Sequence, residues 1–430
     1  MTEKKGFIKI PDNKLEWLPL LRDLYRFEET SVSGPGSHKR RFTDVIWTKS
    51  DAISSLNLDE DQINDFNAML DYLAENRQLM IVPSRGENEP KYLTRVAELV
   101  RTIGHTYEYW SKGRPAIFAT RWLIEDKKVP NLVIPAKVFV ESIKNKCQEL
   151  IPGDRGLNLC KAAEEVCIAV AKSIIPRNWE DVSFSEFQLD ATLKILDSRY
   201  GARDEYRGQV LAAGVGSGKT IAFSIATLIE ARKTMLDGMK NNDYKSSGLF
   251  IYPRTQLAID QHQELEKFAS FMECELPVWL ELSQAYKAEK LTVAQGVPKK
   301  YSADATPIPI IVTTFETLKR RMRRPEFMIK MSKHLSTIVL DEIHLLSGIS
   351  GGMSSHLLSR LAEAVSNSEK DVHWIGASAT IARPDEHGSR LFGLKRTQVQ
   401  VISPRHGEMI QAGINHHIFI RPIQGMSLVG

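Results

Sequence analysis

Apolar residues recur along this chain with two different spacings, and the change between them falls near Trp179 to Phe187. Before that point they return every three or four positions, as in Asp61 to Glu75 and Tyr92 to Tyr109, which is the spacing of amphipathic helices. A proline interrupts the pattern at Val82-Pro83. We therefore predict a mainly helical accessory domain over residues 1–178.

Beyond that point, short β-branched runs alternate with longer helical patterns. This alternation predicts an α/β domain over residues 179–430, with a mostly parallel sheet, helices on both faces, and ligands at the carboxyl ends of the strands. We expect a linker at Pro176 to Glu186 and an insertion at Cys274 to Thr306, where periodicity is weak. The predicted strands are Gln209 to Ala213, Leu249 to Tyr252, Ile308 to Thr313, Thr337 to Leu340, Val372 to Gly376, Thr397 to Ile402 and Ile414 to Arg421.

Composition narrows the class of protein. The 430 residues are 42% hydrophobic and 26% charged, which indicates a globular protein of two or three domains. The formal charge of +4 excludes a highly basic coat protein and a histone-like binder. The four cysteines match no zinc or iron–sulfur spacing. Because we find no signal peptide and no run of about 18 apolar residues, we expect a cytoplasmic protein without membrane contact.

The most specific motif is a glycine-rich segment, Ala213 to Thr220, between the strand Val210 to Ala212 and the helix Ile221 to Arg232. Glycines let successive N–H groups face a polyphosphate, and the positive end of the helix reinforces that anion site. Lys219 would reach the β and γ phosphates, and Thr220 would offer its hydroxyl to Mg²⁺. The predicted nucleotide-binding residues here are Gly214, Gly216, Ser217, Gly218, Lys219 and Thr220.

An acidic pair completes the predicted chemistry. The apolar strand Ser336 to Leu340 ends in Asp341, Glu342, Ile343 and His344. At the carboxyl end of a strand, Asp341 can hold Mg²⁺ while Glu342 polarises the water that attacks the γ phosphate. Guanine-specific switches are excluded because the one matching string, Thr48 to Asp51, lies far upstream of the glycine-rich segment. Protein kinases are excluded because their signature motifs are missing. These exclusions leave an ATPase.

Together the two motifs resemble the superfamily 2 DExH-box helicases and translocases, whose phosphate loop also begins with alanine, as at Ala213. Three further segments match this family in order: Tyr252 to Ala258 resembles motif Ia, Val312 to Leu318 motif Ib, and Ser378 to Thr380 motif III. The resemblance implies a RecA-like lobe over residues 179–430, ATP and Mg²⁺ as cofactors, and nucleic acid as partner. Lys219, Asp341, Glu342 and His344 are then the predicted catalytic residues.

The same resemblance gives roles to residues outside the phosphate site. Ser378 and Thr380 would couple hydrolysis to movement, with a helix cap as the alternative reading. Gln188, in Phe184 to Gln188, resembles the adenine-reading Q motif; the alternative is an ordinary helix start. Phosphate contacts to a nucleic-acid strand are expected from Arg254, Thr255, Thr313, Thr314, Lys319 and Arg320. The last two belong to a basic cluster that is equally compatible with a solvated helical face: Lys319, Arg320, Arg321, Arg323 and Arg324.

Two segments, Asp341 to Arg360 and Ser378 to Glu386, resemble a bacterial branch that includes MrfA-type DNA repair helicases and DrmA-type antiphage helicases. This favours DNA over RNA and suggests a protein partner in a defence complex. No arginine-finger motif occurs in the chain, so we expect the second RecA-like lobe elsewhere, and slow ATP turnover by residues 1–430 alone. The alternative function is an ATP-gated nucleic-acid-binding or scaffold subunit that does not unwind.

Overall fold

The computed structural model describes residues 10–83, 89–106, 117–201, 206–214, 216–238, 247–273, 276–282, 309–366, 372–379, 381–405 and 407–422. The chain forms two compact units. One unit comprises Met1–Val129 together with Ile410–Gly430, and the other comprises Pro130–Met409. The polypeptide therefore crosses between the units twice.

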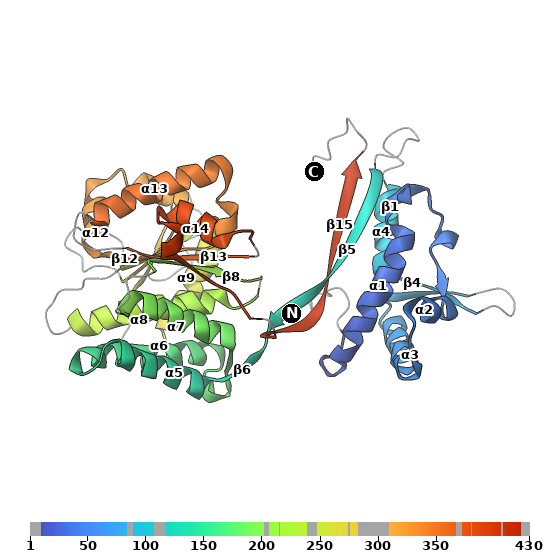
Figure 1. Cartoon of the computed structure of the whole chain (residues 1–430), viewed down its shortest axis with the longest axis horizontal. Helices are drawn as coiled ribbons and strands as arrows, with labels where there is room; N and C mark the ends of the chain where they lie inside the picture. Colours follow the sequence, from blue (N-terminus) through green and yellow to red (C-terminus); the bar gives the residue numbers. More distant parts are fainter. Residues whose placement is uncertain are drawn as a thin grey trace. The chain divides into compact units, whose positions relative to one another are not determined.

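The larger unit is built on a seven-stranded sheet in the order β10-β11-β9-β12-β13-β8-β14 (Figure 1). Every neighbouring pair of strands is parallel, so all carboxyl ends meet at one edge. All residues of β11, β12 and β13 are buried, as expected for a sheet covered on both faces. The strands are β8 (Gly208–Ala212), β9 (Ser247–Tyr252), β10 (Val278–Glu281), β11 (Ile310–Thr314), β12 (Leu335–Leu340), β13 (His373–Ser378) and β14 (Val399–Ile402).

Two layers of helices cover this sheet, each with its own apolar core. Figure 1 shows α5 to α8 on one face and α12 to α14 on the other. The first core draws on α5 (Ala136–Leu150), α6 (Leu157–Ile174), α7 (Glu186–Tyr200), α8 (Lys219–Gly238) and α9 (Thr255–Ala269). The second draws on α11 (Phe315–Arg321), α12 (Pro325–His334), α13 (Gly348–Ser366) and α14 (Pro384–Phe392).

The predicted α/β class with a mostly parallel sheet is confirmed, and the six strands predicted between Gln209 and Ile402 are present with ends shifted by a few residues. Strand β10 was not predicted. It has four residues at the edge of the sheet, inside the segment from Cys274 to Thr306 that we interpreted as an insertion. Most of that segment, including Cys274 and residues 283–308, lies outside the described residues.

The boundary between the units differs from the predicted one at residue 178. Helices α5 and α6, expected in the accessory domain, pack on α8 in the larger unit. Helix α8 is buried well beyond the face that meets the sheet, from Ala222 to Ala231, so it needs a second cover. The expected linker also belongs here, because its strand β7 (Ser183–Ser185) pairs antiparallel with β6 (Leu132–Pro135).

The smaller unit combines helices with strands that the spacing of apolar residues did not predict. A three-stranded antiparallel sheet has the order β2-β4-β3, and a second sheet has the order β1-β5-β15. The helices are α1 (Leu18–Val32), α2 (Lys49–Leu56), α3 (Glu60–Glu75) and α4 (Arg95–Thr106). The strands are β1 (Gly34–Pro35), β2 (Trp47–Thr48), β3 (Leu79–Val82), β4 (Lys91–Thr94), β5 (Ile117–Pro130) and β15 (Met409–Pro422).

Strand β15 contains the predicted strand Ile414 to Arg421 but lies in the smaller unit, beside β5. Trp122 on β5 donates its indole N–H to Nδ1 of His416 on β15 at 3.1 Å, and Tyr25 packs edge-on against His416. The C-terminal strand thus returns to the first unit. The string Thr48 to Asp51 forms the capping box of α2, which explains this match to a guanine motif in structural terms. Among the described residues, no helix is both long and apolar enough to cross a membrane.

Glu28, fully buried in the smaller unit, makes the stability of that unit depend on pH. Its Oε1 accepts hydrogen bonds from Trp47 Nε1 at 2.8 Å and from Thr94 N at 2.7 Å, and Thr94 Oγ1 donates to Oε2. Burial raises the pKa of Glu28 from 4.5 to about 7, against the opposing effect of these hydrogen bonds.

Because the folded state holds this proton more tightly, Glu28 contributes about 3 kcal/mol to the stability of the unit below pH 4.5, and this contribution is lost as pH rises through 7. Hydrogen exchange of α1 and β4, corrected for intrinsic rates, should show weaker protection at pH 8 than at pH 5. Glu28→Gln should remove most of that difference. An unchanged pH dependence in the variant would exclude Glu28 as its source.

Candidate functional site

The parallel sheet brings the predicted motifs to one edge, in two neighbouring groups. The glycine-rich segment follows β8, Ser378 ends β13 and Asp341 follows β12, and these three strands are adjacent. Arg254 follows β9 and Thr314 ends β11, on the other side of β12. The predicted nucleotide residues and the predicted strand-binding residues therefore occupy neighbouring parts of one edge.

The glycine-rich segment has the backbone that a phosphate site requires. Gly216 and Gly218 adopt φ of 78° and 79°, a left-handed region that favours glycine. Helix α8 begins at Lys219, so its first N–H groups point into the same turn. Lys219 Nζ donates to the carbonyls of Ala213 and Gly214 at 2.6 and 2.9 Å, and burial lowers its pKa against the pull of Asp341 and Glu342.

The acidic pair lies opposite this turn and includes a strained residue. Asp341 is 7% exposed, and burial raises its pKa to about 6; the hydrogen bond from the Glu342 N–H opposes this rise, the Glu342 charge adds to it, and the Lys219 charge opposes it. Glu342 has φ of 52°, and its N–H donates to Asp341 Oδ1 at 2.8 Å. A left-handed non-glycine residue costs about 1–3 kcal/mol and is often found at functional sites. His344 Nδ1 lies 3.2 Å from Glu342 Oε2.

Ser378 joins these two motifs. Its carbonyl accepts a hydrogen bond from Ala213 N at 3.2 Å, and its hydroxyl lies 3.4 Å from His344 Nδ1. The side chain of Ser378 is fully buried, which favours a link within the site over a surface helix cap. Thr380, predicted to share the coupling role, lies outside the described residues.

These residues fit a nucleoside triphosphate with Mg²⁺. Ser217 Oγ is buried without a hydrogen-bond partner among the described residues, next to the N–H groups that open α8. Asp341 and Glu342 supply carboxylate oxygens opposite Lys219, and Thr220 follows Lys219 on α8. Thr220 and Asp341 would hold the metal ion, which would supply charge neutralisation on the β and γ phosphates. We find no group of three or more histidine, cysteine or carboxylate ligands within the described chain that suggests another metal site.

Gln188, predicted to read adenine, already has structural partners. It forms a capping box with Ser185: Ser185 N donates to Gln188 Oε1 at 2.9 Å, and Gln188 N donates to Ser185 Oγ at 3.2 Å. A side-chain carbon on Gly218 would lie 2.3 Å from Gln188 Nε2. The structure therefore places Gln188 against the phosphate loop as a support for its turn, and its contact with adenine stays a prediction.

The residues predicted to contact nucleic acid differ in how accessible they are. Arg254 is exposed and Thr255 is partly exposed at the start of α9. Lys319 and Arg320 are exposed on α11, where Arg320 pairs with Glu316 at 3.0 Å. The hydroxyls of Thr313 and Thr314 are buried and hydrogen-bonded, to the carbonyl of Glu281 and to Thr317 respectively. A contact through those two hydroxyls stays a prediction.

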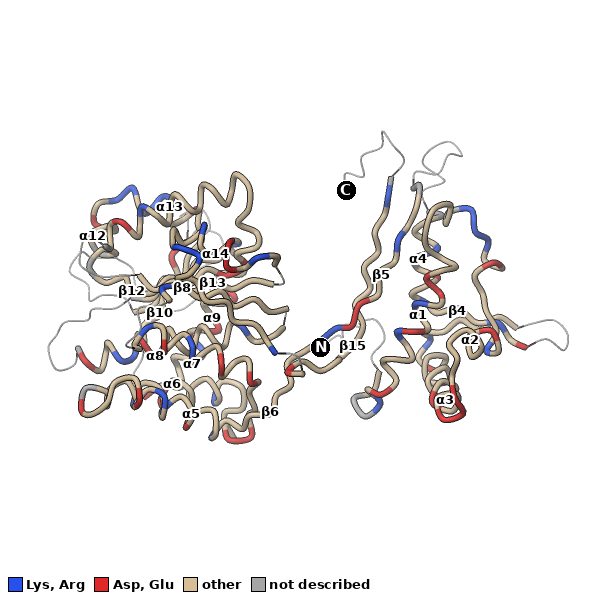
Figure 2. Tube along the Cα trace, viewed as in Figure 1, with Lys and Arg blue, Asp and Glu red and all other residues tan. Residues whose placement is uncertain are grey.

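Charge is spread over the described surface and does not form one basic face. Figure 2 shows basic and acidic segments intermingled in both units. Within the basic cluster that follows β11, Arg321 is bound to the buried carboxylate of Glu281 on β10 through its Nε at 2.7 Å. A nucleic-acid strand would therefore meet individual side chains such as Arg254 and Lys319.

One supporting residue was not predicted from the sequence. His387 on α14 lies with Nε2 at 2.8 Å from the carbonyl of Ile343, and so holds the turn that carries Glu342. Helix α14 packs closely on the sheet because Gly388 has no side chain. A side-chain carbon at this position would lie 2.5 Å from Val210. The nearest sequence signal is this adjacent glycine, which by itself does not indicate a functional residue.

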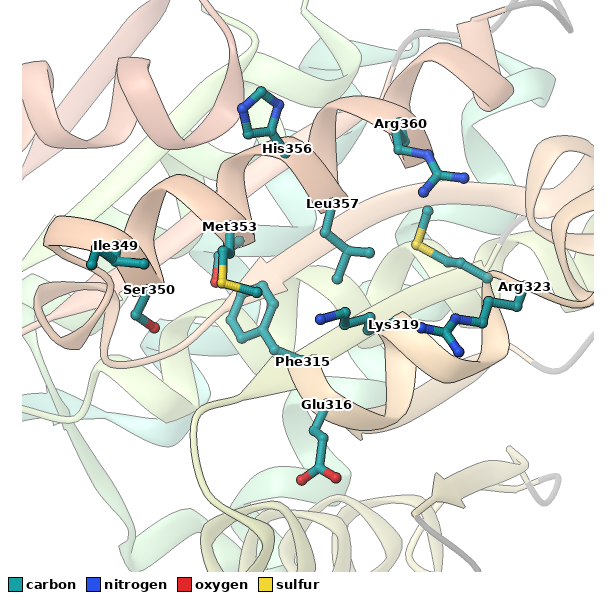
Figure 3. Close-up of a pocket in the computed structure, with 12 residues that line it drawn as sticks. Phe315, Glu316, Lys319, Arg323, Ile349, Ser350, Met353, His356, Leu357 and Arg360 are labelled. Atoms are coloured by element: carbon teal, nitrogen blue, oxygen red, sulfur yellow. The ribbon is translucent and has the colours of Figure 1, made fainter.

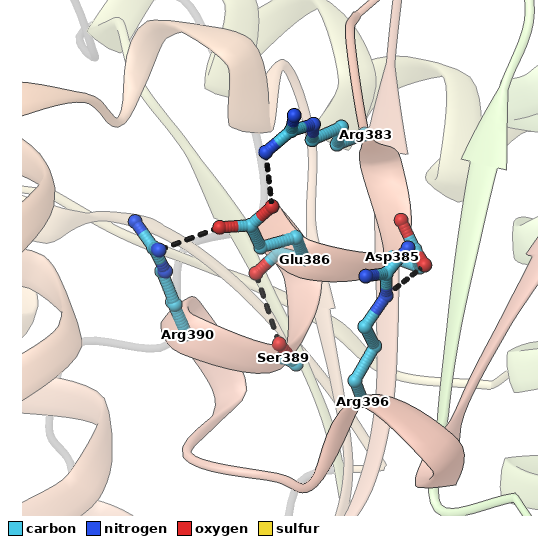
Figure 4. Close-up of polar contacts among 6 residues, drawn as sticks. All are labelled: Arg383, Asp385, Glu386, Ser389, Arg390 and Arg396. Carbon is cyan, nitrogen blue, oxygen red and sulfur yellow. Dashed lines mark hydrogen bonds and ion pairs between the residues drawn. The ribbon is translucent and has the colours of Figure 1, made fainter.

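The charged residues around α14 are paired with one another (Figure 4). Glu386 accepts from Arg383 at 3.3 Å and from Arg390 at 2.5 Å, while Arg396 pairs with Asp385. These arginines are exposed, so the pairs contribute little to stability. Each of these three arginines has a carboxylate partner, with Glu386 shared by two of them.

The phosphate turn gives a first test of the site. Lys219→Ala should lower the affinity for Mg²⁺-ATP by about 10-fold to 100-fold, because one charge-assisted hydrogen bond to a phosphate contributes about 1.5–3 kcal/mol. Lys194→Ala, which removes a lysine paired with Asp190 on the exposed side of α7, is the matched control. Titration with a fluorescent ATP analogue measures both. Equal affinities in the two variants would refute the assignment of Lys219.

Comparison with known proteins agrees with this geometry. The DEAD/DEAH box helicase family matches residues 187–387. The uncharacterized ATP-dependent helicase YprA of Bacillus subtilis (strain 168) is 22% identical over 237 residues, which are 50% of this chain and 29% of YprA. The chain thus spans less than a third of this curated relative.

Solved helicase structures are similar to parts of this chain at low identity. The DUF1998 helicase MrfA is 20% identical, with a TM-score of 0.41 over 56% of this chain and 33% of MrfA. The DEAD-box helicase Mss116 is 14% identical, with a TM-score of 0.43 over 64% of this chain and 47% of Mss116. The family match coincides with the motifs at the sheet edge, so residues 187–387 are identified as a DEAD/DEAH box helicase domain.

Proposed function

We propose that this protein is an ATP-dependent helicase or translocase that couples ATP hydrolysis to movement along a nucleic-acid strand. The observation that carries the proposal is the single sheet edge on which β8, β13 and β12 present the phosphate turn, Ser378 and the acidic pair, with Arg254 and the start of α11 beside them. One edge of the sheet can therefore contact both the nucleotide and the nucleic-acid strand.

Each residue has a role in this proposal. Lys219 binds the β and γ phosphates, Thr220 and Asp341 hold Mg²⁺, and Glu342 orients the attacking water. Ser378 contacts the phosphate turn and His344, and by the family resemblance this link extends to the strand-binding residues. The family resemblance adds a second RecA-like lobe that closes over the nucleotide and supplies an arginine finger.

The finer features of the function also rest on that resemblance. DNA is favoured over RNA because Asp341 to Arg360 and Ser378 to Glu386 resemble the bacterial MrfA-type and DrmA-type branch. The same resemblance supports a cytoplasmic role in antiphage defence or DNA repair. Phosphates, which Arg254 and Lys319 would contact, are shared by both polymers, so this choice needs an experiment.

The experiment is photo-crosslinking of matched single-stranded DNA and RNA oligonucleotides to the protein with a non-hydrolysable ATP analogue. We expect DNA crosslinks to peptides that contain Arg254 and Lys319, with DNA yields above RNA yields. Crosslinks absent from both peptides would refute the strand-binding surface, and equal yields would refute the preference for DNA. Arg254→Ala should lower the yield at its own peptide, whereas Arg383→Ala, on a paired and exposed arginine, should not.

A second candidate is an ATP-gated binding or scaffold subunit that clamps a strand without moving along it. It would use the same phosphate turn, acidic pair and Ser378, which all come from a single sheet. The two candidates differ in strand movement. ATP-dependent displacement of an annealed strand supports the translocase, and ATP-dependent retention without displacement supports the clamp.

A further inference from the structure

A groove between α11 and α13, outside the nucleotide site, has apolar walls and positive edges. It has a volume of about 770 Å³ and lies on the larger unit, on the helix layer opposite α5 to α8 (Figures 1 and 3). Its apolar lining comes from both helices and the turn after α11: Phe315, Met322, Ile349, Met353 and Leu357. None of these side chains is needed for the proposed reaction.

The wall on α13 is exposed to an unusual degree. Ile349 is 87% exposed and Met353 is 56% exposed, and with Leu357 they recur at four-residue steps along one stripe of the helix. Charged or polar residues normally occupy such exposed positions, and contiguous exposed apolar side chains mark interaction sites. The stripe is therefore suited to contact with another apolar surface.

Three cations border this stripe. Lys319 and Arg323 lie along one side, and Arg360 lies across the groove beside Leu357 (Figure 3). Within the part of the chain that the structure describes, these three residues make no ion pair, unlike the paired arginines around α14. The carboxylate of Glu316 points away from the groove in Figure 3 and is paired with Arg320. The edges therefore carry uncompensated positive charge.

We propose that this groove binds an amphipathic, acidic α-helix of a partner protein. Apolar residues at helical spacing on that helix would cover Ile349, Met353 and Leu357, and flanking Asp or Glu side chains would pair with Arg323 and Arg360, which the proposed strand-binding surface does not use. The lining favours this occupant over a single strand of nucleic acid. Bases stack on aromatic rings, of which the groove has only Phe315 and His356 among its lining residues, whereas its apolar wall is aliphatic and includes two flexible methionines, which suit a peptide.

Selection from a displayed library of random peptides of about 16 residues, longer than the stripe, tests the proposal on the whole chain. We expect enriched sequences with apolar residues at three- and four-residue steps and acidic flanks. A synthetic enriched peptide should bind Met353→Glu on the order of tenfold more weakly, since it loses a central apolar contact. Arg323→Glu should weaken binding less and reduce its salt dependence.

Ile329→Glu is the matched control, because Ile329 is 55% exposed on α12 and does not line the groove. The proposal is overturned by the absence of enriched peptides, by enriched peptides with basic flanks, or by peptides that bind Met353→Glu as well as wild type. The binding of single-stranded DNA or RNA of about 20 nucleotides to wild type and to Met353→Glu is measured as well. If Met353→Glu weakens nucleic-acid binding as strongly as peptide binding, the groove binds nucleic acid and the proposal fails.

Discussion

Glu342→Gln is expected to lower the rate of ATP hydrolysis by about 10²-fold to 10⁴-fold while leaving ATP bound, because the amide can no longer accept a proton from the attacking water. The structure favours this residue over its neighbours. Glu342 is held at φ of 52°, its N–H is bonded to Asp341, and His387 fixes the next carbonyl of the turn. In the proposed role, this backbone conformation would aim the carboxylate of Glu342 at the attacking water.

Single-turnover release of radiolabelled phosphate, with protein in excess and single-stranded DNA present, measures this effect even where turnover is slow. Glu316→Gln is the control, because it removes an exposed carboxylate on α11 that pairs with Arg320. If Glu342→Gln hydrolyses ATP within about threefold of the wild-type rate, another group prepares the water, and the assigned roles of the acidic pair are wrong.

Arg232→Ala is expected to destabilise the larger unit by about 3–5 kcal/mol, because it leaves a buried carboxylate without its partner. Arg232 on α8 is 1% exposed and donates through Nε to Glu165 on α6 at 2.8 Å. The other oxygen of Glu165 accepts from the backbone N–H of Glu273. This ion pair joins α6 to α8, so its removal tests whether α5 and α6 belong to the larger unit.

Urea unfolding followed by circular dichroism measures this loss, with two controls. Lys233→Ala removes the neighbouring pair with Asp237, which is more exposed, and should cost less than about 1 kcal/mol. The double replacement Arg232→Met with Glu165→Leu should cost less than Arg232→Ala, since no buried charge remains. A loss below about 1 kcal/mol in Arg232→Ala would show that the pair does not fasten the two helices.

The sheet and the nucleotide motifs could be predicted because both are local in sequence. A buried strand such as Leu335–Leu340 is a continuous apolar run, and the glycine-rich turn needs its residues in immediate succession. The parallel order then brings the ends of β8, β13 and β12 together without further information.

The domain boundary could not be predicted, because it depends on which surfaces meet. The apolar stripe of α6 predicts a buried face, but the spacing does not say that α8 is what covers it. Strand β15 is similar: its alternation predicts a strand, but the partner β5 lies about 290 residues earlier in the sequence. The hydrogen bonds of the Thr313 and Thr314 hydroxyls, to the carbonyl of Glu281 and to Thr317, could not be predicted for the same reason, because they depend on how the chain packs.

The most direct measurement is hydrogen exchange of the whole chain with and without a non-hydrolysable ATP analogue and Mg²⁺. We predict slower exchange at Gly216 to Ala222 and at Asp341 to His344, where backbone amides frame the proposed nucleotide site. The same experiment on Lys219→Ala should show little protection at the same analogue concentration. Unchanged exchange in both segments of the wild type, or protection that survives in Lys219→Ala, would contradict the assignment of this sheet edge as the ATP site.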